Sequence, residues 1–377
     1  RAVRHYDGLL QNVAVLPHLR RNRAIALAHL GLLHHAAHRN QKARQLMDDA
    51  VVELARLADA PTAGVGEFEP LANAHTIRGR ILRDLAVDDE AEKDFGNSLH
   101  LFVEELIPLE SQATEEQRVE FRRSVAACGR HYTVLLERLG HDQEVEQEFD
   151  TALRLLEDAL KVEPQNPRVL DEMAFWNESR GDFHRRKQAA QLASEAYRQA
   201  LAVRRQLPDE PEYLARRIRV LLKLGGPSDL EQAAADAEKL VQFQPKHAGY
   251  QTLKAHVDFR RDQCDACLRT LDALPPDDLT SPGAERLFLL AMARHKRKQG
   301  DDWERAKESL EQALKLMQQE SPGDVLMAEL RDEAARLLGV PSTTKAERAA
   351  AETDPPDPED RPPPEPLSKG KPTVDAD

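Results

Sequence analysis

Four histidines lie close together in the sequence, at His29, His34, His35 and His38. On a helix, His34 and His38 share one face, and two imidazoles four residues apart are a common half of a zinc site. A complete site needs further ligands, and no cysteine or carboxylate accompanies this cluster in the sequence. We therefore expect interior or surface histidines here and no bound metal.

The three cysteines are Cys128, Cys264 and Cys267, and the last two form a C-x-x-C motif. Redox motifs of this form lie at a helix N-terminus within an α/β fold. We place this motif in the middle of a helix, with Ala266 at a small packing position. The sequence therefore predicts two packing cysteines, and three cysteines do not make a disulfide framework.

Three segments look like short sequence motifs of protein kinases, which catalyse phosphoryl transfer. Residues 64–68 look like a glycine-rich loop, residues 83–85 look like a catalytic loop, and residues 94–96 read Asp-Phe-Gly. The chemistry also needs a strand lysine, a histidine before the arginine and an asparagine five residues after the aspartate. Leu82 and Asp89 occupy the last two positions, and no lysine-bearing strand is apparent. The sequence predicts neither a catalytic residue nor a cofactor.

The composition favours helices and opposes two classes of partner. Charged residues make up 32% of the 377 residues, aromatic residues make up only 5%, and the net charge is −13. Nucleic-acid binding needs a clustered cationic surface, which an acidic balance opposes. No apolar run is long enough to span a bilayer. We expect no nucleic-acid or membrane partner for this chain and a cytoplasmic location, or an extracytoplasmic one if a membrane segment precedes residue 1.

Small residues recur at a fixed spacing along most of the chain. Twelve residues separate Gly31 from Ala43 and Gly79 from Ala91, and a large apolar residue and another small one follow within two turns. Antiparallel helices approach closely only where the crossing side chains are small, so this spacing predicts stacked helix pairs that stabilise one another. The packing residues predicted in this way are Leu27, Gly31, Ala43, Ala50, Gly79, Ala91, Phe95, Phe149, Ala152, Ala193, Tyr197, Ala306 and Ala313.

The pattern predicts about seven helix pairs, several of them irregular. The small residue of each second helix is placed at position 43, 91, 145, 193, 234, 266 or 306. Most of these steps exceed the ideal length of about 34 residues, so residues 59–70 and 107–114 are interpreted as connecting loops. The fourth pair is interpreted with about four extra residues in its turn, and the seventh with one extra residue near Asp302.

On these residues the chain resembles the tetratricopeptide repeat family over roughly residues 24–320. The resemblance implies an all-α fold, a right-handed superhelical α-solenoid of tetratricopeptide-like helix pairs. The chain is also similar to the C-terminal repeat regions of bacterial serine/threonine protein kinases, in residues 2–10, 288–293, 300–301, 306–313 and 329–339. That similarity implies a signalling protein with a kinase domain upstream of residue 1.

The resulting domain organisation has four parts. We expect an introductory helix at 1–23, the repeat array at 24–320, a capping helix at 321–340 and a disordered tail at 341–377 that is rich in proline and acidic residues. Closely spaced prolines forbid a regular helix in the tail. A proline-reading partner domain that binds the tail is the alternative interpretation.

One face of the first helix of every pair lines a concave surface in a stacked array. Arginines on such a face clamp carboxylates or stack on aromatic rings, and ordinary solvated helix surface is the alternative. Counting from the small residues of the first helices predicts these groove residues: His35, Asn73, Thr76, Arg80, Arg83, Arg130, Glu137 and Arg138.

The leading hypothesis is therefore a non-catalytic protein–protein interaction scaffold that binds a peptide or protein segment in a concave groove, as the recruiting region of a serine/threonine kinase. A preformed surface limits the ordering cost of binding. The first alternative is an enzyme with an unrecognised all-helical active site, which requires a deep pocket with perturbed pKa values. The second is a helical-repeat RNA binder, which the acidic balance opposes.

Overall fold

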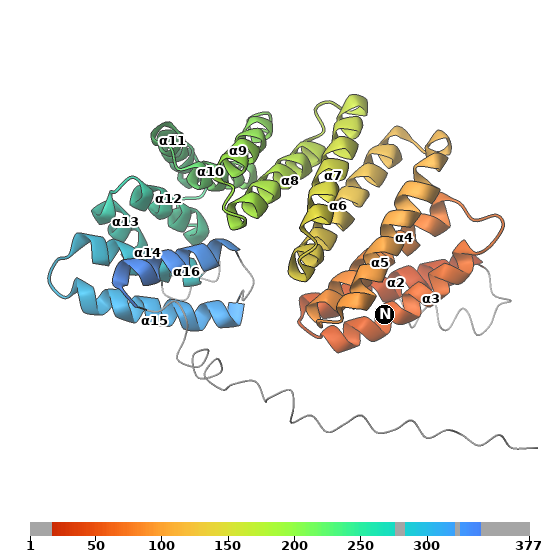
Figure 1. Ribbon diagram of the computed structural model, residues 1–377, viewed down its shortest axis with the longest axis horizontal. Coiled ribbons are helices and arrows are strands. Elements are labelled where there is room, and N and C mark those ends of the chain that lie inside the picture. The colour runs from red at the N-terminus through yellow and green to blue at the C-terminus, as the bar shows by residue number, and fades with distance from the viewer. Residues whose placement is uncertain (1–16, 276–282, 321–324, 341–377) are drawn as a thin grey trace, which may run out of the picture. The chain divides into compact units, whose positions relative to one another are not determined.

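The computed structural model describes residues 17–275, 283–320 and 325–340, and all regular structure in these ranges is helical (Figure 1). The chain divides into two compact units, residues 1–236 and 237–377, with the division inside α11. The predicted tail at 341–377 and residues 1–16 lie outside the described residues.

The first unit consists of helix pairs in chain order. Their bounds are α2 (Pro17–Ala36), α3 (Asn40–Ala58), α4 (Val65–Asp84), α5 (Asp88–His100), α6 (Glu115–Leu139), α7 (Asp142–Val162), α8 (Pro167–Arg186), α9 (Ala190–Arg204), α10 (Pro211–Leu224) and α11 (Pro227–Phe243). The first helices of neighbouring pairs also touch: α2 contacts α4, α4 contacts α6, and α6 contacts α8. Their exposed side chains therefore share one face of the unit.

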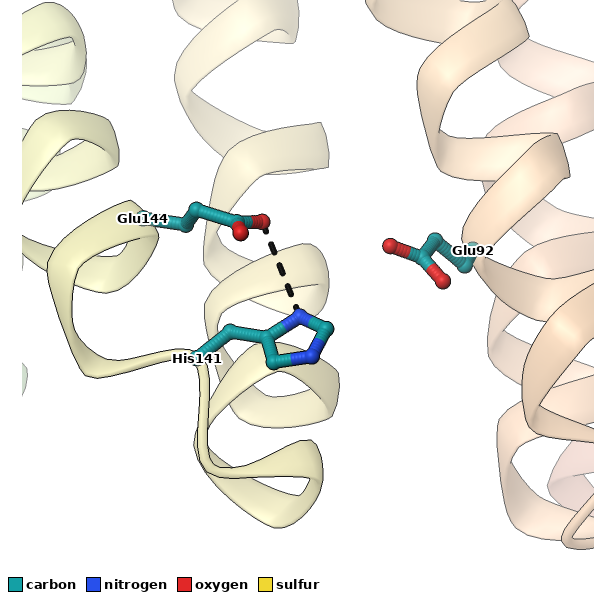
Figure 2. A group of neighbouring side chains, drawn as sticks. All are labelled: Glu92, His141 and Glu144. Carbon is teal, nitrogen blue, oxygen red and sulfur yellow. Dashed lines mark ion pairs between the residues drawn. The ribbon is translucent and has the colours of Figure 1, made fainter.

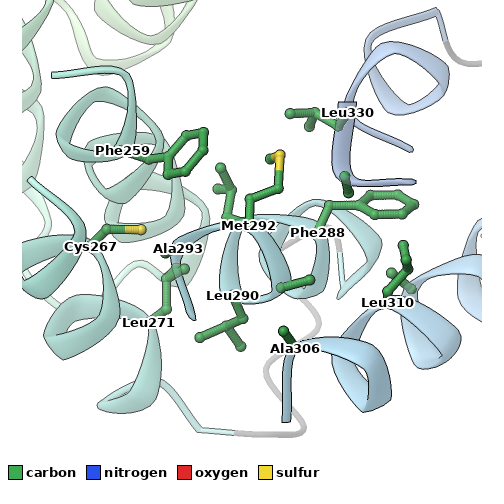
Figure 3. Close-up of a cluster of buried hydrophobic side chains, with 14 of the residues drawn as sticks. Phe259, Cys267, Leu271, Phe288, Leu290, Met292, Ala293, Ala306, Leu310 and Leu330 are labelled. Carbon is green, nitrogen blue, oxygen red and sulfur yellow. The ribbon is translucent and has the colours of Figure 1, made fainter. Parts of the chain in front are cut away.

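The second unit is built around α14 (Gly283–Arg297). The helices packed with it in this unit are α12 (Ala248–Arg260), α13 (Cys264–Asp272), α15 (Asp302–Glu320) and α16 (Val325–Leu338). Six consecutive residues of α14, 288–293, are buried, so this stretch of the helix is apolar on every side. Figure 3 shows Phe288 of α14 between Leu310 of α15 and Leu330 of α16. The helix α16 thus covers the core that the last pair leaves open, which is the role of a capping helix.

The twelve-residue spacing brings helices together where the sequence predicts it. A Cβ atom added to Gly79 would lie 2.9 Å from Cε1 of Phe95, and one added to Gly31 would lie 2.9 Å from Sδ of Met47. The second helix therefore packs its large side chain directly against the backbone of the first. All thirteen predicted packing residues are buried. Seven helix pairs are present in the described residues, as predicted, and the right-handed superhelical path of the array stays a prediction.

Left-handed backbone conformation ends the first helix of most pairs. His38, Ala86, Gly140, Gln188 and Asp262 have φ between 56° and 78°, and each lies five residues before a buried residue of the second helix. The next residue donates its backbone N–H five residues back, as from Val87 to Leu82 O at 2.9 Å. This is the Schellman pattern, which satisfies the last carbonyls of a helix. Four of these five residues are not glycine, although the left-handed region favours glycine.

The register of three pairs differs from the prediction. Ala234 and Ala266 are only half-buried, and their neighbours Ala233 and Cys267 are the fully buried residues. In the fourth pair, the turn has the ordinary three residues, 187–189, and the predicted extra residues are absent. The close approach there is made by Gly181, twelve residues before Ala193, and an added Cβ would lie 2.5 Å from the Tyr197 ring. The seventh pair does have a longer turn, residues 298–301.

Two predicted loops are shorter than expected. The helix α4 begins at Val65 and includes Pro70, so the first loop covers only residues 59–64. The second predicted loop contains a 3-10 helix, η2 (Pro108–Gln112), which follows a π-helical segment, η1 (Leu101–Leu106), that continues α5. Phe102 and Leu106 of η1 are buried, so the extra length is part of the core. At the start of the chain, residues 17–23 belong to α2, the first helix of the array.

Replacing Ala86 by glycine should stabilise the protein. Because Ala86 has φ +56°, Ala86→Gly relieves left-handed strain, and we expect the free energy of unfolding to rise by about 0.5–1 kcal/mol in urea denaturation. The matched control is Ala202→Gly, at an exposed position within α9. This substitution should lower the free energy of unfolding by about 1 kcal/mol. A loss of stability in both variants would contradict the left-handed assignment.

Replacement by alanine should have opposite effects on stability at two glycines of the second pair. Gly79→Ala should lower the free energy of unfolding by about 1–3 kcal/mol, because the buried Phe95 ring has no room to move away from the new methyl group. Gly96→Ala, with no atom within 4 Å of the added Cβ, should raise it by up to about 1 kcal/mol. Thermal unfolding followed by circular dichroism measures both changes, and a stabilised Gly79→Ala variant would refute the close crossing.

Candidate functional site

Cationic and imidazole side chains from three successive pairs gather in the first unit. They are His35 of α2, Arg80 and Arg83 of α4, and Arg130 and His131 of α6, which we call the arginine cluster. Arg83 Nη1 donates to the backbone oxygen of His131 at 3.4 Å, across the contact between α4 and α6. The three helices α2, α4 and α6 are first helices of their pairs, so the cluster lies on the face that these helices share.

Two of the three arginines have partners within the protein. Arg83 donates to Asp84 Oδ1 from Nη2 at 2.9 Å and from Nε at 3.1 Å. Arg130 lies 3.7 Å from Glu172 Oε1, and its guanidinium carbon lies 4.8 Å from the centroid of the Phe175 ring. Arg130 therefore makes a cation–π contact and one long ion pair.

Arg80 has no such partner. It makes no hydrogen bond or ion pair within the part of the chain that the structure describes, and its Nε atom is buried without an acceptor, as is Nε of Arg130. Burial lowers the pKa of Arg80, the charges of Arg83 and Arg130 lower it further, and the charge of Asp84 offsets part of this effect. The cluster thus combines an excess of positive charge with buried donors that lack acceptors.

His131 does not add to this charge. Burial lowers the pKa of His131 to about 2, and Arg80, Arg130, Arg83 and His35 all act in the same direction. The imidazole is therefore neutral at physiological pH. His35 donates from Nδ1 to Asn40 Oδ1 at 3.1 Å, with its Nε2 atom 3.5 Å from Asp84.

The other predicted groove residues lie in different settings. The Thr76 hydroxyl lies 2.7 Å from the Ser98 hydroxyl, between α4 and α5, so it serves packing within the pair. Glu137 accepts from Arg186 Nη2 of α8 at 2.5 Å. Arg138 binds Asp88 and donates to the backbone oxygen of Arg83 at 3.2 Å. Asn73 is half-buried.

The Asp-Phe-Gly segment has a structural role. Asp94 is buried in α5, where it accepts from Arg78 Nε at 2.6 Å and lies 2.8 Å from His75 Nδ1. Burial alone would raise the pKa of Asp94, but the hydrogen bonds from Arg78 and His75 and their charges lower it below its ordinary value. Phe95 fills the crossing at Gly79, and Gly64 precedes α4 at its N-cap. Asp94 and Phe95 of the segment that looks like a kinase motif are thus buried residues with structural roles in the second pair.

A buried charge network, which the sequence analysis did not identify, joins α8, α9 and α10. Lys223 donates to Glu178 Oε1 at 2.9 Å and to Asp182 at 2.8 Å, and Arg204 donates to Glu178 Oε2 at 2.9 Å and to Asp171 at 3.0 Å. Burial would raise the pKa of Glu178, but Lys223 and Arg204 lower it. Its charges are paired, so this network holds helices together and offers no open binding group.

The C-x-x-C motif lies in a different place from the one predicted. Cys264 is the first residue of α13, so the motif forms the first turn of that helix and not its middle. Burial raises the pKa of the Cys267 thiol to about 12 and raises that of Cys264 as well. Cys267 packs in the core of the second unit, in agreement with the predicted packing role. Thiols of raised pKa are poor nucleophiles.

No protein-family model matches the chain, and no curated protein matches it. Among solved structures, the chain is similar to a tetratricopeptide repeat protein from Parabacteroides merdae, with 13% identity and a TM-score of 0.45 over 84% of this chain and 98% of that one. It is also similar to BtubC from P. vanneervenii, with 14% identity and a TM-score of 0.46 over 74% and 92%. A third is YrrB, described as a tetratricopeptide repeat protein with an unusual peptide-binding site, with 16% identity and a TM-score of 0.32 over 58% and 98%.

The fold is that of a tetratricopeptide-like helical repeat. Its features are paired antiparallel helices, small residues at the helix crossings and a covering helix at the end. Among the described helices, none has the length and apolar character that crossing a membrane requires. The class of protein that this fold defines is an all-α helical-repeat protein.

Removing the Asp94 carboxylate should destabilise the second pair. We expect Asp94→Asn to lower the free energy of unfolding at pH 7 by about 2–4 kcal/mol, because Arg78 then loses a buried counter-charge. The lowered pKa of Asp94 means that its contribution is complete above its ordinary value of 3.8 and is lost as the pH falls through the folded value. The gap between wild type and variant should therefore narrow below that pH in urea denaturation.

Asp49→Asn, at an exposed position of α3, is the control and should change the free energy of unfolding little at either pH. A gap between wild type and Asp94→Asn that stays constant on acidification would contradict the ionised state of Asp94.

Proposed function

We propose that the first unit is a protein-interaction scaffold that binds an acidic peptide segment of a partner protein at the arginine cluster. The observation that carries this proposal is Arg80, a half-buried arginine with a buried Nε atom and no acceptor among the described residues, beside two further arginines. A buried donor without an acceptor costs about 1–3 kcal/mol, and more when it is charged. A carboxylate from a partner would supply the missing acceptor.

The geometry suits recognition of a carboxylate by planar guanidinium groups. Arginine donates two parallel hydrogen bonds to a carboxylate, and such charge-assisted bonds are stronger in a partly buried site than in water. Arg130 is already oriented by the Phe175 ring, and Arg83 by Asp84. Because the side chains stand on packed helices, little conformational freedom is lost on binding.

The imidazole of His131 is neutral, so it adds no further repulsion among the arginines. This arrangement keeps the positive charge on groups that cannot lose it, since arginine stays protonated at all physiological pH values. Binding should consequently depend on salt concentration far more than on pH between 6 and 8.

A narrower form of the proposal makes the repeat array the recruiting region of a cytoplasmic serine/threonine kinase. Its support is the similarity to the ends of such repeat regions in residues 288–293, 300–301, 306–313 and 329–339. It is tested by comparing phosphorylation of substrates by the full-length protein with and without the array. Equal rates would remove the recruiting role and leave the peptide-binding proposal intact.

The peptide-binding proposal is tested with an array of random-sequence peptides. Wild-type protein should select peptides rich in Asp and Glu, and fluorescence anisotropy with one selected, labelled peptide should show a loss of affinity of about tenfold or more for Arg80→Met and for Arg130→Met. Higher ionic strength should weaken the binding.

Arg56→Met is the matched control, because Arg56 is an exposed arginine of α3 whose side chain is 67% accessible. It should bind the peptide like wild type. The proposal fails if the selected peptides show no acidic bias, or if replacing Arg80 leaves their affinity unchanged while circular dichroism shows a folded variant.

A further inference from the structure

Three side chains with metal-binding atoms converge on the junction between the second and third pairs. Glu92 lies on α5, His141 in the turn before α7, and Glu144 on the first turn of α7. One ligand atom from each lies within 4.8 Å of the others, and Nδ1 of His141 is 3.6 Å from Glu144 Oε2. Figure 2 shows the Glu92 carboxylate facing the other two across the space between α5 and α7.

The backbone of the turn before α7 positions His141 and Glu144 close together. His141 is the N-cap residue of α7, with non-helical φ −85° and ψ 57°, and its backbone oxygen accepts the N–H of Glu144 at 3.1 Å. The turn therefore presents an imidazole and a carboxylate three residues apart on one side. The Tyr132 hydroxyl donates to Glu92 Oε1 at 3.5 Å and so restricts the orientation of the third carboxylate.

A second observation indicates that this region lacks a cation. The carboxylates of this region are Glu92, Glu144 and Glu148, and none of the three forms an ion pair with a lysine or arginine in the described part of the chain. Elsewhere, partly buried carboxylates such as Glu178 and Asp94 have cationic partners.

We propose that Glu92, His141 and Glu144 bind a divalent transition-metal ion of the Zn²⁺ type. One imidazole and two carboxylates form a mixed nitrogen and oxygen donor set, which suits Zn²⁺, whereas Mg²⁺ and Ca²⁺ prefer oxygen alone. Three protein ligands leave a fourth position for water or for a group of a partner. Side-chain rotations of the exposed His141 and Glu144 toward the half-buried Glu92 would bring the ligand atoms to the distances of about 2.0–2.2 Å that zinc requires.

The bound ion would join the second helices of two neighbouring pairs, since Glu92 belongs to the second pair and the other two ligands to the third. Metal binding would then stabilise this junction by mass action. This site does not depend on the arginine cluster, and either proposal can fail without the other.

The test is isothermal titration calorimetry of chelator-treated, tag-free protein with ZnCl₂. We expect one saturable equivalent of Zn²⁺, with affinity reduced about tenfold or more in each of Glu92→Gln, His141→Ala and Glu144→Gln. Bound Co²⁺ should show the visible absorption of a four-coordinate site, and this signal should be lost in His141→Ala.

His29→Ala and Glu157→Gln are the matched controls, because both residues are exposed helix residues outside the group. They should bind Zn²⁺ like wild type. The proposal is overturned if no saturable binding occurs below millimolar Zn²⁺, or if the three ligand variants bind as wild type does. A loss of binding in His29→Ala alone would instead place the ion at the histidine cluster of α2 and would equally overturn it.

Discussion

The close approach of two helices at a residue with a minimal side chain is the constraint on which the rest of the structure depends. At Gly79 the ring of Phe95 occupies the volume that a Cβ atom would need, and Tyr197 does the same at Gly181. A large side chain from the second helix thus touches the backbone of the first, which fixes both the distance between the helices and their register. The positions of the side chains on the outer faces of these helices follow from that register.

The fixed register explains how residues about fifty positions apart come to act together. Arg80 and Arg130 lie on first helices of consecutive pairs, and because α4 contacts α6, their guanidinium groups influence each other electrostatically. The same geometry applied to second helices brings Glu92 of α5 near His141 and Glu144. The first three pairs therefore hold an excess of positive charge at one place and an excess of negative charge at another, whereas the α8–α10 network balances its charges.

Much of the fold could be predicted from the sequence, because spacing of small residues is a local signal that directly reflects helix crossing. The seven pairs and the covering helix at 325–338 are examples. The predicted register was wrong where two small residues were adjacent candidates for the packing position, as with Ala233 and Ala234. It was also wrong where the packing residue was a cysteine, as with Cys267. Gly181 was missed because the fourth turn was interpreted as lengthened.

The candidate site was only partly predictable. Counting along helix faces identified His35, Arg80, Arg83 and Arg130, because a helix face follows from periodicity alone. It did not identify His131 or the partner of Thr76, since these depend on which helix packs beside which. The group at Glu92, His141 and Glu144 was also missed, because its members come from different pairs and share no spacing in the sequence.

The longer turn at residues 298–301 shows where the chain tolerates variation. One more residue separates α14 from α15 than separates α2 from α3, yet Ala306 is as deeply buried as Ala43. Insertions at these hairpin tips leave the helix crossing unchanged, since the crossing is set by side-chain contact and not by the connection. The tips between helices are thus natural positions for grafting a foreign segment, such as an epitope or a fluorophore attachment sequence, without disturbing the array.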